Sequence, residues 1–122
     1  MQIEYLKDDG AGIAVISSDE KVVVDTQSAL DMALSAKYET GADRIAIAKD
    51  LVCEDFFILS TGVAGEILQK FINYRIKLAV YGDYSRYTSK PLRDFIYESN
   101  RGKDFFFVSS KEEAIRKLTQ SE

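Results

Sequence analysis

The sequence predicts an α/β fold, in which a mixed β-sheet of about five strands is covered by about four helices. Short apolar runs alternate with longer segments whose apolar residues repeat at helical spacing, and an Asp-Gly pair separates the first two runs. This alternation favours parallel strands joined by right-handed crossovers. We therefore expect an N-terminal antiparallel hairpin followed by later strands that run parallel.

The N-terminal part of the chain carries the hairpin and the first helix. We expect strands at about residues 2–7 and 11–17, joined at Asp8-Asp9-Gly10, because Asp-Gly between apolar runs is a strong hairpin signal. Asp25 or Thr26 is the expected cap of the helix that follows. The apolar stripe of this helix is expected to consist of Ala29, Leu30, Ala33, Leu34 and Tyr38.

The remainder of the chain repeats a strand–helix pattern. Strands are expected at 44–48, 76–81 and 105–108, and residues 53–59 form a helical turn or an irregular crossing. Helices are expected from residue 63, after a cap at Thr88 or Ser89, and after a cap at Ser109 or Ser110. At 122 residues the chain fits one domain, residues 1–122.

Composition excludes several kinds of chemistry. The chain is 46% hydrophobic and 30% charged with one proline, which is typical of an ordered globular protein. It has no histidine, which removes serine–histidine triads and the usual zinc sites. Cys53 has no partner for an internal disulfide and is expected to be a packing residue. We expect no catalytic residue, cofactor or metal, and a non-enzymatic protein rather than an enzyme.

The chain shows no targeting or membrane signal. Residues 1–9 lack a basic segment followed by an apolar run, and no later stretch approaches the roughly 18 apolar residues that a membrane span needs. We therefore expect a cytoplasmic protein that does not bind a membrane.

Charge is unevenly distributed. The formal net charge is −4, and residues 1–61 carry 5 basic and 12 acidic side chains against 11 and 8 in residues 62–122. Between Lys70 and Lys103, eight basic residues are interleaved with tyrosines. Such a stretch can bind nucleic acid or anionic ligands, although solvated helix faces explain it equally in an acidic protein. Nucleic acid is not the partner we expect.

Two stretches resemble the STAS domain, the fold of bacterial anti-sigma-factor antagonists and of transporter C-terminal domains. Residues 57–65, Phe-Ile-Leu-Ser-Thr-Gly-Val-Ala-Gly, look like the STAS stretch in which Asp, Ser, Ser or Thr, and Gly open a helix. Residues 107–118 look like the closing strand and the Ser-x-Glu-Glu-Ala helix. The resemblance implies a protein partner and a phosphorylation switch at Ser60 or Thr61, with Leu59 in place of the family's Asp.

A narrower resemblance covers almost the whole chain. Residues 55–57, 61–71 and 89–100 are similar to an uncharacterised bacterial group, the domain of unknown function family DUF4180. This resemblance implies no particular activity.

The hydroxyl pair before the helix expected from residue 63 is the preferred site. Ser60 and Thr61 lie at an expected helix N-terminus, where unpaired N–H groups stabilise an added phosphate, although helix capping alone would also explain them. Gly62 and Gly65 would permit a tight turn and close helix–sheet packing, and Glu66 follows on the helix. We expect these five residues to form a regulatory surface for a protein partner.

An alternative is a site for a small anionic ligand. Asp83 follows a predicted central strand, at the edge where open α/β sheets usually bind ligands. Lys49 ends the neighbouring strand, and Glu66 and Arg93 lie on the adjoining helices. Polar loop residues and a solvated helix face account for the same pattern, and the sequence leaves a homodimer open.

Overall fold

The computed structural model describes residues 1–121 and confirms the α/β prediction, with four helices around a five-stranded mixed sheet. The strands are β1 (Gln2–Asp8), β2 (Ala11–Ser17), β3 (Arg44–Ala48), β4 (Lys77–Tyr81) and β5 (Phe105–Val108). The helices are α1 (Thr26–Thr40), α2 (Val63–Asn73), α3 (Lys90–Asn100) and α4 (Lys111–Gln120). Between β3 and α2 lie three short 3-10 turns, η1 (Lys49–Leu51), η2 (Glu54–Phe57) and η3 (Leu59–Thr61).

The strands lie side by side in chain order, β1-β2-β3-β4-β5. β1 and β2 are antiparallel and every later pair is parallel, as the sequence predicts. The hairpin turn consists of Asp9 and Gly10, with φ of 49° and 85°. A two-residue hairpin of type I′ needs positive φ at both positions, and glycine adopts it without steric cost. The Asp-Gly pair therefore sets the hairpin.

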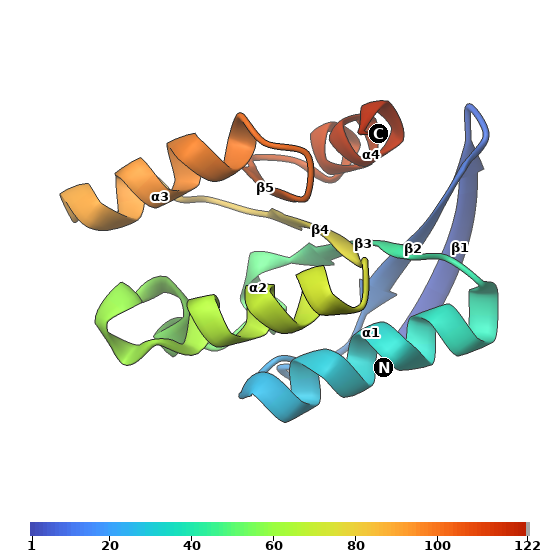
Figure 1. The fold of residues 1–122 in the computed structure, drawn as a ribbon, viewed down its shortest axis with the longest axis horizontal. Coiled ribbons are helices and arrows are strands. Elements are labelled where there is room, and N and C mark those ends of the chain that lie inside the picture. The colour runs from blue at the N-terminus through green and yellow to red at the C-terminus, as the bar shows by residue number, and fades with distance from the viewer. Residues whose placement is uncertain (122) are drawn as a thin grey trace.

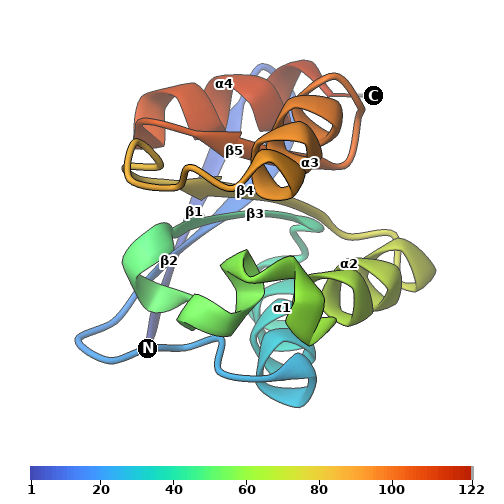
Figure 2. The same cartoon turned by 90° about the vertical axis from the view of Figure 1, so that its left-hand side faces the viewer.

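Helices cover both faces of the sheet (Figures 1 and 2). α1 and α2 lie next to each other on one face, α4 lies on the other, and α3 runs beside β5. In β3, Ile45 and Ile47 face the α1–α2 side and Ala46 faces α4. Burial on both faces explains why the parallel strands are continuous apolar runs. Within the described part of the chain, no helix combines the length and apolarity needed to cross a membrane.

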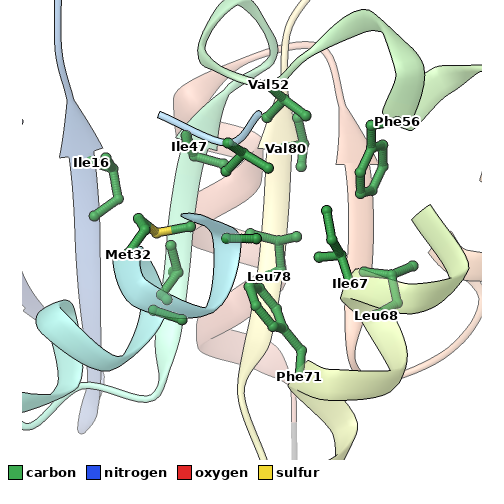
Figure 3. Packing of buried hydrophobic residues seen from close by; sticks show 14 of the residues in the cluster. Ile16, Met32, Ile47, Val52, Phe56, Ile67, Leu68, Phe71, Leu78 and Val80 are labelled. Atoms are coloured by element: carbon green, nitrogen blue, oxygen red, sulfur yellow. The ribbon is translucent and has the colours of Figure 1, made fainter. Parts of the chain in front are cut away.

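The larger part of the core lies between the sheet and α1–α2 (Figure 3). Met32 from α1 and Ile67 and Phe71 from α2 are buried against Ile47 and Leu78 of the central strands. Each of these side chains is less than 5% exposed. Their burial removes apolar surface from water and holds the helices on the sheet.

The stripe predicted for α1 is partly wrong. The buried residues of α1 are Ala29, Met32, Ala33 and Ala36, whereas Tyr38 is 92% exposed. Nine positions at about 100° each place Tyr38 on the opposite side of the helix from Ala29. The alanines instead bring α1 close to the sheet.

Side chains cap three of the helices. Of the two candidates for α1, Asp25 is the cap: its carboxylate accepts from Ser28 N at 2.8 Å, and Asp25 N donates to Ser28 Oγ at 3.0 Å. The bond from the Ser28 backbone lowers the pKa of Asp25 below its usual value. Ser89 caps α3 and Ser110 caps α4, each one of the two residues predicted for its helix.

The outer side of β5 is bonded by a side chain of α3. Asn100 Nδ2 donates to Phe107 O at 3.0 Å, and Asn100 Oδ1 accepts from Phe107 N at 2.7 Å. The amide therefore satisfies both backbone groups that Phe107 turns away from β4.

We expect Asn100→Ala to lower the free energy of unfolding by about 1–3 kcal/mol, because it leaves a part-buried N–H and C=O unpaired. Urea unfolding followed by circular dichroism measures the change. The control is Asn73→Ala, whose side chain accepts a hydrogen bond from Gln69 on the exposed side of α2 and bonds no other group among residues 1–121. This variant should shift stability by less than about 0.5 kcal/mol. Equal midpoints for the two variants would contradict this role of Asn100.

Candidate functional site

The carboxyl ends of β3 and β4 meet at one edge of the sheet. Lys49 and the three η turns follow β3, and residues 82–89, hereafter the ridge, join β4 to α3. The η2–η3 turns (green) and the start of α3 (light orange) lie at the same end of the molecule in Figure 1. Ligands of open α/β sheets usually bind at this edge.

Lys49 is buried at this edge. It is 7% exposed, and its Nζ lies 4.8 Å from the ring centroid of Tyr87 and 5.4 Å from that of Phe57. Among residues 1–121, no carboxylate oxygen comes within 4.0 Å of this ammonium. The faces of the two rings therefore stabilise its charge in place of an ion pair.

Gly82 gives the Lys49 side chain its space. A Cβ atom built on Gly82 would lie 2.7 Å from Lys49 Cβ, which is closer than real Cβ contacts. The Gly82 N–H donates to Val108 O at 3.0 Å, so the backbone here is bonded to the end of β5. A glycine at this position lets the end of β4 lie directly on the lysine stem.

Two side chains fix the start of the ridge. Asp83 Oδ1 accepts from Ser85 N at 2.8 Å. Hydrogen bonds from Ser85, and then the charges of Lys49 and Arg86, lower the pKa of Asp83. Tyr84 donates its hydroxyl to Val80 O at 2.7 Å, and burial raises the pKa of this phenol.

Glu54 joins the ridge to η2. Its carboxylate accepts from the Tyr87 hydroxyl at 2.8 Å and lies 3.6 Å from the Arg86 guanidinium. The Tyr87 ring stacks on Phe57, with centroids 5.5 Å apart and planes at 24°. The two segments that border the site are therefore held together by both polar and aromatic contacts.

A hollow lies on each side of the ridge. The first, the Ser60 groove, has a volume of about 510 Å³ and is lined by residues 57–60 and 86–89 with Pro91 and Leu92. The second, the Arg93 hollow, has a volume of about 470 Å³ and is lined by residues 84, 85, 87 and 88 of the ridge and by Arg93, Ile96, Tyr97 and Asn100 of α3. Tyr87 and Thr88 belong to both.

The structure separates the two hydroxyl groups that the sequence singles out. Ser60 is exposed in the Ser60 groove, and its hydroxyl bonds no other group within residues 1–121. Thr61 Oγ1 lies 2.7 Å from Asp55 O and 2.8 Å from Ile58 O, so the Thr61 hydroxyl donates its hydrogen bond within the turn. Neither residue is the cap of α2. That position belongs to Gly62, which has a φ of 80° and no side chain.

Of the remaining predicted site residues, only Lys49 and Asp83 come together. Gly65 faces solvent, since a Cβ there would meet nothing within 4 Å, and the expected close packing of this glycine on the sheet is wrong. Glu66 Oε2 accepts from Thr26 Oγ1 at 3.0 Å and so turns toward α1. Lys49 and Asp83 are neighbours, whereas Arg93 lines the hollow on the far side of Tyr87.

Sequence reasoning missed Tyr84, Tyr87, Glu54 and Arg86 as site residues. The usable signal was the basic, tyrosine-rich stretch, in which Tyr84 and Tyr87 follow a strand closely.

Cys53 is half-buried against the core, as predicted. No three Cys, Asp or Glu side chains gather as a metal site among the residues that the structure describes.

The fold and the site define an α/β domain with a polar and aromatic site at the carboxyl edge of parallel strands. Residues 8–118 match the model of a family described as Domain of unknown function (DUF4180), and the chain belongs to that family. The resemblance to DUF4180 found in the sequence is thereby confirmed. Comparison with curated proteins and with solved structures gave no match.

We expect Gly82→Ala to lower the free energy of unfolding by about 1–3 kcal/mol, because its methyl group overlaps the stem of buried Lys49. Gly65→Ala is the matched control. It adds the same methyl group to an open helix position and should be neutral or stabilising by up to about 1 kcal/mol. Denaturant unfolding compares the two. A Gly82→Ala variant as stable as Gly65→Ala would show that Lys49 moves aside freely.

Proposed function

We propose that this chain is a non-enzymatic, STAS-like regulatory domain of the cytoplasm that binds a protein partner through the Ser60 groove and the adjoining start of α2. The observation that carries the proposal is the pairing of exposed apolar surface with an exposed serine. Ile58 is 47% exposed beside Ser60, and both line the groove.

The groove supports a partner with apolar side chains. Phe57 and Leu92 are buried beneath it, and Ile58 and Pro91 offer the exposed apolar surface that a partner would cover. Burial of such surface is the main driving force of association. Tyrosine and arginine, the residue types most often critical in interfaces, stand opposite as Tyr87 and Arg86.

Charge supports an acidic residue in the partner segment. The Arg86 side chain is 70% exposed, and its contact with Glu54 at 3.6 Å is an exposed ion pair. Exposed ion pairs contribute little, so a carboxylate of a partner competes with Glu54 at small cost. The proposed partner is therefore an extended segment in which an apolar residue neighbours an acidic one.

Ser60 supports regulation by phosphorylation better than Thr61 does. The Ser60 hydroxyl is exposed and unbonded within the described residues, whereas the Thr61 hydroxyl is committed to the turn. A phosphate adds about −1.5 to −2 charges at pH 7. On the wall of this groove it would compete for Arg86 and repel an acidic partner, and so release it.

The four-residue anionic site is a weaker candidate on geometry. Glu66 bonds Thr26 on α1, and Arg93 lines a hollow whose lining includes none of the other three residues. Lys49 and Asp83 alone remain adjacent.

We expect Ser60→Glu to reduce recovery of the partner at least about tenfold in quantitative pull-downs from native lysate, because it places a negative charge in the groove. Ser60→Ala and Ser35→Glu, the latter on the exposed side of α1, should recover the partner as the wild type does. Ile58→Asp should lose it. Equal recovery of every protein by wild type, Ser60→Glu and Ile58→Asp would refute the proposal.

A further inference from the structure

We infer that the Arg93 hollow is a second binding site, which takes a small planar aromatic ring bearing an anionic group, either carboxylate or phosphate. This goes beyond the proposed function, because the proposed partner occupies the Ser60 groove on the other side of the ridge.

The walls are aromatic, and hydrogen bonds of their hydroxyl groups fix Tyr84 and Tyr87 in place. Tyr84 and Tyr87 have ring centroids 6.2 Å apart, and Tyr97 of α3 is 61% exposed. The hydroxyl groups of Tyr84 and Tyr87 already donate to Val80 O and Glu54, so these residues offer ring surface rather than hydrogen bonds. Rings held in advance bind a planar ligand without a further ordering cost.

The cation of the hollow has no internal partner. Arg93 is exposed, and its guanidinium makes no ion pair or hydrogen bond with any residue that the structure describes. Its basic neighbours differ: the Lys90 ammonium on α3 lies 2.6 Å from the Asp94 carboxylate, and the Arg101 guanidinium, directly after α3, lies 5.5 Å from the centroid of the Tyr97 ring. A free guanidinium binds carboxylate or phosphate oxygens through two parallel hydrogen bonds.

The combination selects the ligand class. A simple inorganic anion would bind Arg93 without contacting the tyrosine rings. A neutral aromatic ring would contact the tyrosines but leave the Arg93 guanidinium unpaired. A ring with an attached anion uses both, and the exposed Thr88 hydroxyl on the ridge offers a further donor. The volume of about 470 Å³ lies within the range of small-molecule sites.

Amide NMR titration of the full chain tests the inference with four probes: phenyl phosphate, benzoate, inorganic phosphate and benzyl alcohol. We expect saturable shifts at residues 84–88 and 93–100 with phenyl phosphate or benzoate. The relative affinity of these two distinguishes a phosphate from a carboxylate ligand. Inorganic phosphate and benzyl alcohol should bind at least about tenfold more weakly, because each uses only half of the site.

Variants locate the site. Arg93→Gln and Tyr97→Ala should each weaken the ring-bearing anion about tenfold or more, since they remove the charged hydrogen bonds and one wall. Lys90→Gln, one turn away on α3, removes a paired cation and should leave affinity unchanged. Ile58→Asp should also leave it unchanged, which separates this test from that of the Ser60 groove.

Three results would overturn the inference. The first is no saturable shift with either ring-bearing anion at about 10 mM, a concentration above the dissociation constants of even weak specific sites. The second is binding that survives both Arg93→Gln and Tyr97→Ala. The third is inorganic phosphate binding as tightly as phenyl phosphate, which would show that the tyrosines contribute nothing.

Discussion

Burial of both faces of β3 and β4 is the constraint on which the rest of the structure depends. The residues of these strands that face α1 and α2, such as Ile47 and Val80, and those that face α4, such as Ala46 and Ala79, are all fully covered. The interior of a strand buried in this way has no position for a charged side chain, and the charged residues of these strands, Arg44 and Lys77, stand at their first positions. Functional groups are therefore confined to the ends of the strands, and polar and aromatic residues gather where β3 and β4 stop.

The fold was predictable because independent local signals agree. Asp9-Gly10 specifies a hairpin turn, Ser89 and Ser110 stand where helices must begin, and the apolar runs have strand length. The prediction that Tyr38 shares the apolar stripe of α1 was wrong for a geometric reason. A residue nine positions after Ala29 lies on the opposite side of the helix. Residues 53–59, in the crossing between β3 and α2, were predicted only as a helical turn or an irregular crossing, because 3-10 turns of three or four residues are too short to show a sequence period.

The site was predictable only in part. Strand order suffices to bring Lys49 and Asp83 to one edge. It does not say that Lys49 is covered by Phe57 and Tyr87, which depends on how the ridge folds over it. The path of the ridge follows from contacts between residues far apart in sequence, such as Tyr87 with Glu54. Those contacts also divide the edge into two hollows, which no local sequence pattern predicts.

The side-chain amide of Asn100 affects whether a strand of another copy of this chain can pair with β5. An open edge strand is a template on which another chain can add a strand, and proteins that leave one bare risk aggregation. Asn100 occupies the backbone groups of Phe107 that an added strand would need, which blocks growth of the sheet at β5. At the opposite end, β1 carries exposed Glu4, Lys7 and Asp8, and charged side chains on an edge discourage the same addition. The sheet is thus limited to its own strands by a single amide at one margin and by charge at the other.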